Sequence, residues 1–274
     1  MGIAPSVAAF ITSCCVALDR AGQNAGRCLT LGKQGIHVSE AQLYHILANH
    51  GLVEVDAGKA ATIPQWMGAA RARLEEQDKI LATIPGRRGL GEISDSMFFE
   101  CLGFTDVHSV DASDYEGADF VHDLNQPGLA EVVDGPYDLV IDVGTMEHVF
   151  NVPGVLRNIF DVLKIGGSII HVVPANNLVD HGFYQFSPVL FYQYYLENSY
   201  RLIACYFTEE SATGIFGEPI SFHEYPGTSD LSQEILKGSD TATYGTAFCA
   251  QKTEATTWDT IPQQSSYTEK WDSQ

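Results

Sequence analysis

The feature that most constrains this chain is a strand–helix–strand pattern between residues 137 and 173. YDLVIDVG (137–144) is a continuous apolar run typical of a buried strand, and a polar turn follows it. From Val152 to Leu163 apolar residues recur at i, i+3 and i+4, which predicts an amphipathic helix that ends at Gly166 and Gly167. SIIHVV (168–173) is a second buried strand. Two buried strands joined through a helix predict a right-handed crossover in a parallel sheet.

Strand and helix patterns continue on both sides of this unit. Ser39 and Gln42 form a capping box, and Ser94 begins a further helix that Gly103 ends. The alternation predicts the α/β class, with a doubly wound, mostly parallel sheet covered on both faces. The other predicted strands span 28–32, 106–111, 119–123, 200–207 and 246–252, and the helices span 3–18, 39–50, 64–84, 94–102 and a segment from Ser187 onward.

The chain length of 274 residues favours one domain, 1–274, with additions. Far more residues separate Gly35 from Asp111 than the about 20 of a simple strand–helix–strand unit. We therefore predict a helical insertion over 39–90, after the first strand, which would form a lid. Residues 209–243 are interpreted as a loop-rich insertion, and 254–274 as a polar, frayed C-terminal tail.

Charge and cysteine content exclude several partners. The formal net charge is −20, from 35 acidic and 15 basic residues, so a nucleic-acid phosphate backbone would be repelled. The six cysteines show no metal-binding or disulfide spacing and are predicted to be reduced, buried thiols. No apolar run is long enough to span a membrane. We expect a cytoplasmic protein with a small-molecule substrate, and the sequence leaves a homodimer open.

Ligands of open α/β sheets bind beyond the carboxyl ends of the strands, where loops and helix N-termini present backbone N–H groups. This rule selects the turn from Gly32 to Gly35, Asp111 with Ser113, Asp123, and the segment from Asp142 to His148. A carboxylate at the end of the second strand is placed to accept hydrogen bonds from ribose hydroxyls. The rule does not identify the nucleotide.

Residues 107–177 resemble the class I S-adenosylmethionine-dependent methyltransferases. In that family the fourth strand is followed by an E-H pair, a helix, a K-x-G-G turn and the fifth strand; the corresponding residues here are Glu147-His148 and Lys164–Gly167. The closest likeness is to uncharacterised bacterial methyltransferase type 11-like proteins with LG-x-Q and HGFYQFSP motifs. The resemblance implies a seven-stranded Rossmann-like sheet, S-adenosylmethionine as cofactor, and an enzyme that transfers a methyl group.

The resemblance also implies roles for single residues. Asp111, in VDAS, looks like the ribose carboxylate, and Asp123, in HDLN, looks like the acceptor of the adenine amino group. Together with the strand-end rule, this gives the predicted cofactor-binding residues Gly32, Gln34, Asp111, Ala112, Ser113, Asp123, Leu124, Asp142, Gly144 and Glu147.

The chain departs from the family pattern in its first motif. Where the family has acid-x-Gly-x-Gly-x-Gly, this chain has Thr30, Gly32, Gln34 and Ile36, so only the first glycine is present. The stretch between Ser113 and Asp119 is also too short for the usual helix. Two alternatives therefore stay open: a degenerate methyltransferase-fold binding protein without activity, and a nicotinamide oxidoreductase, which the glycine pattern fits less well.

The segment after the fifth predicted strand, PANNLVDHGFYQFSP, is dense in polar and aromatic groups. His181 is the leading general-base candidate and His148 the second, each weighed against a role in holding a turn in shape. The predicted substrate-binding residues are Asn176, Asn177, Tyr184, Gln185 and Phe186. The predicted reaction is methylation of an oxygen or nitrogen atom of a small polar metabolite, such as a sugar or a natural-product intermediate.

A metal site is not predicted from the sequence. Candidate ligands include Asp142, His148, Asp180 and His181, or separately His223 and Glu224, but no ligand spacing supports either set.

Overall fold

The computed structural model describes residues 2–19, 26–53, 92–210, 220–227 and 242–272. They divide into two compact units, one made of Met1–Cys28 and Gln34–Val107, the other of Leu29–Lys33 and His108–Gln274. The helix expected over 64–84 lies outside the described residues. The single-domain organisation and the 39–90 insertion remain predictions.

The described residues of the first unit form three helices and a small sheet. Ser39 caps one helix by accepting a hydrogen bond from the backbone N–H of Gln42, whose side chain accepts from the Ser39 N–H in return. Ser94 caps another by accepting from the Met97 N–H. Both predicted helix starts are thus confirmed. The elements are β1 (Gly2–Ile3), paired in parallel with β3 (Gly35–Ile36), α1 (Pro5–Ala17), α2 (Glu40–Asn49) and α4 (Asp95–Cys101).

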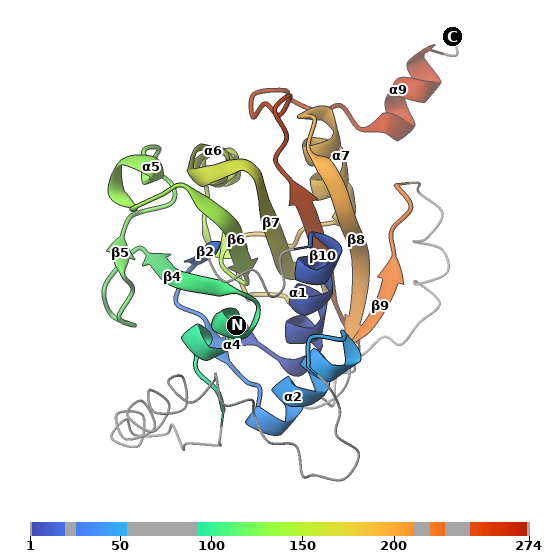
Figure 1. The fold of residues 1–274 in the computed structure, drawn as a ribbon. Coiled ribbons are helices and arrows are strands. Elements are labelled where there is room, and N and C mark those ends of the chain that lie inside the picture. Colours follow the sequence, from blue (N-terminus) through green and yellow to red (C-terminus); the bar gives the residue numbers. More distant parts are fainter. Residues whose placement is uncertain (1, 20–25, 54–91, 211–219, 228–241, 273–274) are drawn as a thin grey trace. The chain divides into compact units, whose positions relative to one another are not determined.

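The second unit is built on a large mixed sheet, in the strand order β5-β4-β2-β6-β7-β10-β8-β9 (Figure 1). Neighbours β4 and β5 are parallel, as are β6 and β7, whereas β10 runs antiparallel between β7 and β8. The predicted α/β fold is therefore confirmed. The strands are β2 (Gly26–Leu31), β4 (Phe104–Asp111), β5 (Phe120–Val121), β6 (Tyr137–Val143), β7 (Leu163–Asn176), β8 (Arg201–Glu210), β9 (Ser221–Glu224) and β10 (Thr243–Gln251). Only the C-terminal residues of β2 and β4 belong to this unit.

β9 is an eighth strand that the sequence did not indicate. It pairs antiparallel with β8 at the edge of the sheet, inside the segment 209–243 that we expected to be loop-rich. Its four residues are mostly exposed, so they lack the apolar pattern by which a strand is recognised.

Every residue of β6 is buried, as expected for a central strand covered on both faces. The helices α5 (Leu129–Val132), α6 (Val152–Val162) and α7 (Pro188–Glu197) share one hydrophobic core cluster with the sheet.

One predicted boundary is wrong: α6 ends at Val162, and Gly166 and Gly167 lie inside β7. A Cβ atom added to Gly167 would lie only 2.9 Å from the Tyr137 carbonyl oxygen, which is too close for any other residue. The glycine therefore allows β7 to lie close to β6.

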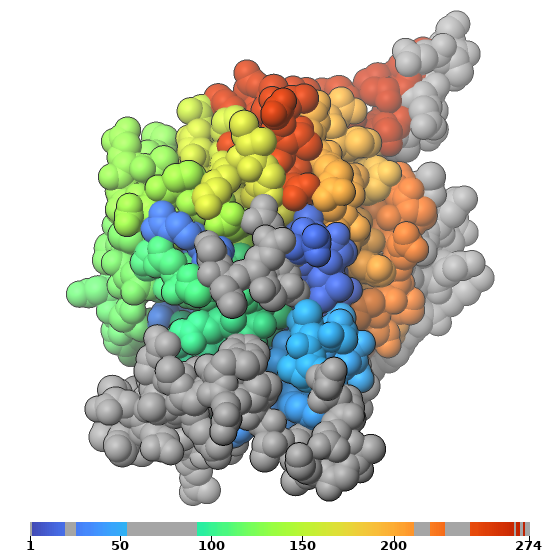
Figure 2. Space-filling view, in the orientation of Figure 1, coloured from blue at the N-terminus to red at the C-terminus, as the bar shows by residue number. Residues whose placement is uncertain are grey.

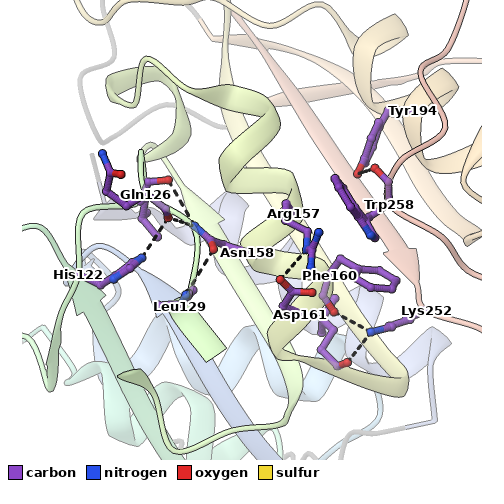
Figure 3. A network of polar contacts seen from close by, with 12 residues as sticks. His122, Gln126, Leu129, Arg157, Asn158, Phe160, Asp161, Tyr194, Lys252 and Trp258 are labelled. Atoms are coloured by element: carbon purple, nitrogen blue, oxygen red, sulfur yellow. Dashed lines mark hydrogen bonds and ion pairs between the residues drawn. The ribbon is translucent and has the colours of Figure 1, made fainter. Parts of the chain in front are cut away.

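The buried side chain of Asn158, on α6, holds the loop that follows β5 (Figure 3). Its amide nitrogen donates to the carbonyl oxygens of Gln126 at 2.8 Å and Leu124 at 3.4 Å. Its amide oxygen accepts from the N–H of Leu129 at 3.4 Å. One asparagine therefore satisfies three backbone groups and positions the loop.

Replacing Asn158 with alanine is expected to lower the free energy of unfolding by about 1–3 kcal/mol, because the backbone groups of the buried residues Leu124 and Leu129 lose a hydrogen bond and the Gln126 carbonyl oxygen keeps only its contact with His122. Denaturant titration measures this change. Asn176→Ala is the matched control, since that side chain is exposed and its loss should change stability by no more than about 0.5 kcal/mol. Equal stability of the two variants would show that the network contributes little.

Residues 258–260, at the start of the segment predicted to be a frayed tail, bond to other residues of the second unit. Trp258 stacks under the guanidinium of Arg157, 3.9 Å from the ring centroid, and its carbonyl oxygen accepts from the Tyr194 hydroxyl (Figure 3). Asn198 donates to the carbonyl oxygen of Thr260. Figure 2 shows the red C-terminal segment lying on the surface beside the residues of α6 and α7. The last described element is α9 (Ser265–Asp272).

All six cysteines are free and buried, as predicted. Burial raises the pKa of the Cys101 and Cys205 thiols to about 12, so these two are unreactive at neutral pH. Among the helices that the structure describes, none combines the length and the hydropathy of a membrane span.

Candidate active site

The turn after β6 is built by the carboxylate of Asp142. One oxygen accepts hydrogen bonds from the N–H groups of Thr145 and Met146, which begins the short 3-10 helix η2 (Met146–His148). The Thr145 hydroxyl donates to the Leu31 carbonyl oxygen at 2.6 Å. The turn after β6 is thereby tied to the end of β2. Gly144 supplies the positive φ of 73° that the turn requires.

The other oxygen of Asp142 contacts a buried histidine that the sequence analysis missed. His171 lies opposite Asp142 in the parallel register of β6 and β7. Its Nδ1 is 2.7 Å from Asp142 Oδ2, and its Nε2 is 2.7 Å from the Tyr195 hydroxyl. Because the carboxylate only accepts, Nδ1 of a neutral ring carries the hydrogen and Nε2 accepts from Tyr195.

This arrangement corrects the role predicted for Asp142. The side chain is fully buried, and both of its oxygens contact protein groups, so it does not face a ligand. Asp142 instead shapes the turn that presents Glu147 and His148. Part of this signal was present in the sequence, because Asp142 and His171 are the polar residues of the apolar segments 139–143 and 169–173.

The structure brings three predicted site residues together: Glu147, His148 and His181. The Nε2 atoms of His181 and His148 lie 3.5 Å and 3.8 Å from Glu147 Oε1, and the two imidazole ring centroids are 5.0 Å apart. Glu147 and His148 follow β6, whereas His181 follows β7, the parallel neighbour. The cluster therefore forms where two parallel strands end, which is where ligands of α/β sheets bind.

Glu147 is enclosed, and the two histidines are open. The Glu147 side chain is 0% exposed, against 46% for His148 and 31% for His181. Burial raises the pKa of the Glu147 carboxyl to about 8, and the negative charge of Asp142 adds to the rise. Burial, and then the charge of His181, lower the pKa of His148. The cluster thus pairs a buried carboxyl with imidazoles that substrate can reach.

The loop carrying His181 is fastened to the Glu147 backbone. The N–H groups of Phe183 and Tyr184 both approach the Glu147 carbonyl oxygen, at 2.9 Å and 3.2 Å. A Cβ on Gly182 would come within 2.9 Å of that oxygen, so glycine permits the close approach. His181 is therefore held beside Glu147 by backbone geometry.

Several predicted substrate residues hold the loop in shape instead. Asn177 has a positive φ of 60° and donates to the Ala242 carbonyl oxygen, and Gln185 accepts from the Leu178 N–H. Phe186 is 5% exposed and packs in the core cluster, which argues against its predicted contact with substrate. The Tyr184 hydroxyl donates to the Phe150 carbonyl oxygen. Asn176 is exposed at the end of β7.

Asp111 lies next to the glycine turn after β2, as the sequence predicted. Its Oδ2 is 3.5 Å from the Lys33 backbone nitrogen, and Oδ1 accepts from the Ala112 N–H at 2.6 Å. Gly32 has a φ of 73°, and its N–H donates to the carbonyl oxygen of Val110, the residue before Asp111. The ends of β2 and β4 therefore meet at a partly exposed carboxylate. Ala112 and Ser113 follow it on the surface.

The remaining predicted cofactor residues are in different environments. Asp123 is exposed, and its Oδ1 accepts from the backbone and side-chain nitrogens of Asn125, which lower its pKa. Leu124 is buried in the core cluster. Gln34 belongs to the first unit and is buried there.

Residues 89–218, slightly less than half of the chain, match a family model described as a methyltransferase domain. No curated protein matches the chain. Over these residues the chain is similar to methyltransferase domains, and this similarity supports an enzyme that uses S-adenosylmethionine as its cofactor.

Solved structures similar to this chain include a SAM-dependent methyltransferase from Archaeoglobus fulgidus, 13% identical, with 88% of this chain and 93% of that one covered and a TM-score of 0.38. An O-methyltransferase from a trans-AT PKS multienzyme of Brevibacillus brevis, bound to S-adenosyl-L-homocysteine, is 11% identical, with 85% and 68% covered and a TM-score of 0.35. The [4+2]-cyclase SpnF is 14% identical, with 89% and 80% covered and a TM-score of 0.35. Similarity this low says nothing about activity.

Proposed function

We propose that the protein transfers a methyl group from S-adenosylmethionine to an oxygen or nitrogen atom of a small polar metabolite, such as a sugar or a natural-product intermediate. The observation that carries the proposal is the Glu147, His148 and His181 cluster at the ends of β6 and β7. The ends of β2 and β4, with Gly32 and Asp111, belong to the same unit. Cytoplasmic location and dimerisation remain predictions.

The residues at the ends of β2 and β4 fit a nucleoside. Asp111 is partly exposed, and its carboxylate can accept further hydrogen bonds from the two ribose hydroxyls. The left-handed turn at Gly32 leaves no Cβ beside it. Asp123 Oδ2, which receives no hydrogen bond from Asn125, would accept from the adenine amino group.

The cluster would take the proton of the methyl acceptor. S-adenosylmethionine supplies a methyl carbon that the positive sulfur already activates, so the protein has to align the acceptor and remove its proton. His181 is held beside Glu147 and is partly exposed, so its imidazole can reach an acceptor hydroxyl or amine. Glu147 would orient the imidazole, and its ionised form, which predominates above its pKa of about 8, would stabilise the positive charge that the imidazole gains.

Exposed aromatic rings give the acceptor a surface on which to lie. Phe150 and Phe183, 69% and 67% exposed, pack edge to face with their centroids 5.8 Å apart. Phe150 follows η2, and Phe183 follows His181 by two residues. An acceptor with an apolar face, such as one side of a sugar ring, would fit these rings while its hydroxyls face the histidines.

The cofactor half of the proposal predicts a large loss of affinity in Asp111→Ala. Charge-assisted hydrogen bonds contribute about 1.5–3 kcal/mol, so the Kd for S-adenosylmethionine should rise about 10- to 100-fold. Isothermal titration calorimetry measures it. The matched control is Asp114→Ala, an exposed carboxylate on the same loop, which should leave the Kd unchanged. Equal affinities in both variants would refute the assignment of Asp111 to the ribose.

A further inference from the structure

The cluster of Glu147, His148 and His181 has the spacing of metal ligands. One side-chain ligand atom from each residue lies within 4.8 Å of the other two. The distances of 3.5 Å and 3.8 Å from Glu147 Oε1 to the imidazole nitrogens are too long for good hydrogen bonds. Ligands around a tetrahedral zinc ion with bonds of 2.0–2.1 Å lie about 3.3 Å apart, so small side-chain shifts would complete the site.

A second observation is that three polar atoms of this cluster lack hydrogen-bond partners. Both carboxylate oxygens of Glu147 and the Nε2 atom of His181 are buried and receive no hydrogen bond. A buried carboxylate without a partner is costly, and a cation between the three side chains would remove that cost. The backbone contacts of Gly182 and Phe183 with Glu147 hold the ligands in place before any ion binds.

We propose that Glu147, His148 and His181 bind one divalent transition-metal cation of the zinc class. Two imidazole nitrogens and one carboxylate are typical ligands for such ions, whereas calcium and magnesium prefer oxygen ligands. Three protein ligands leave a coordination position open. Since the His148 side chain is 46% exposed, that position can be reached from solvent.

The role of this ion rests on the proposed methyl transfer, although its binding does not. An acceptor hydroxyl bound at the open position would lose its proton to water more readily, because the cation lowers its pKa. The oxygen would then form a bond to the methyl carbon while the carbon–sulfur bond breaks, with its electron pair going to sulfur. In this form of the enzyme the histidines act as ligands, and the metal ion takes over the activation of the acceptor.

The test uses the full chain, freed of metal by a chelator and titrated with Zn²⁺ alone in a calorimeter. We expect one equivalent to bind, with at least tenfold weaker affinity in His148→Ala and in Glu147→Gln. His148 is exposed enough for its variant to fold, which thermal melting checks. The control is His223→Ala, whose side chain on β9 is 43% exposed and lies outside the cluster, and it should bind as the unmodified protein does.

Cobalt(II) supplies an independent readout, because its visible absorption changes when imidazole and carboxylate ligands surround it. The band should appear with the unmodified protein and be lost in His181→Ala. No binding, or equal binding in the cluster variants, would overturn the proposed site. Titration of the metal-free protein with S-adenosylmethionine separates the two proposals. Cofactor binding without zinc binding refutes only the metal site. Zinc binding without cofactor binding refutes only the methyl transfer.

Discussion

The His181→Ala variant is expected to bind S-adenosylmethionine as the unmodified protein does and to lose about 10²- to 10⁴-fold in kcat. The reason is geometric. His181 is the partly exposed imidazole nearest Glu147 Oε1, at 3.5 Å, and so can contact both the acceptor and the buried carboxyl. The loss follows whether the imidazole takes the acceptor's proton itself or holds a cation that promotes the proton's release.

The measurement is methyl transfer to an acceptor found by screening small hydroxyl and amine metabolites. The matched control is His223→Ala, which removes a similarly exposed imidazole elsewhere in the same unit and should leave kcat unchanged. If His181→Ala retained full activity, the cluster would have no part in the chemistry.

The largest effect on stability is expected for His171→Ala. This change leaves the Asp142 carboxylate and the Tyr195 hydroxyl buried without their shared partner, and it opens a cavity among aromatic rings. Leaving a buried polar group without its hydrogen-bond partner costs about 1–3 kcal/mol, and more when the group is a charged carboxylate. For a chain of this size the melting temperature should fall by on the order of 10 °C.

Calorimetric melting compares this variant with His223→Ala, for which we expect a change within about 0.5 kcal/mol. His171→Asn is a useful companion, because its amide can still donate to Asp142 and should recover part of the loss. A His171→Ala protein as stable as the control would mean that the Asp142, His171 and Tyr195 contacts do not stabilise the turn at η2.

The sheet could be predicted because burial leaves a clear pattern in the sequence. The continuous apolar runs at β6 and β7 and the caps at Ser39 and Ser94 each have a local physical cause, and the structure confirms them. β9 was missed because an exposed edge strand carries no such pattern. The contacts of residues 253–260 were missed because polar residues such as Thr260 and Asn198 pair only through the tertiary fold.

The candidate site was partly predictable for the same reason. The strand-end rule and the family resemblance selected Asp111, Glu147 and His148, and the polar, aromatic segment after the fifth predicted strand supplied His181. The structure places ligand atoms of Glu147, His148 and His181 within 4.8 Å of one another. The contact between Asp142 and His171 was not predicted, because it depends on the register that sets the two residues opposite each other. Asn177 and Gln185 were predicted to bind substrate because sequence alone does not show which side chains bond to the protein's own backbone.

The most direct test of the account is a crystal structure of the protein with S-adenosyl-L-homocysteine. The account predicts that the two ribose hydroxyls lie within hydrogen-bonding distance of the Asp111 carboxylate, with the sulfur directed toward Glu147, His148 and His181. A nucleoside bound away from the ends of β2 and β4, or the absence of binding at saturating ligand, would contradict it.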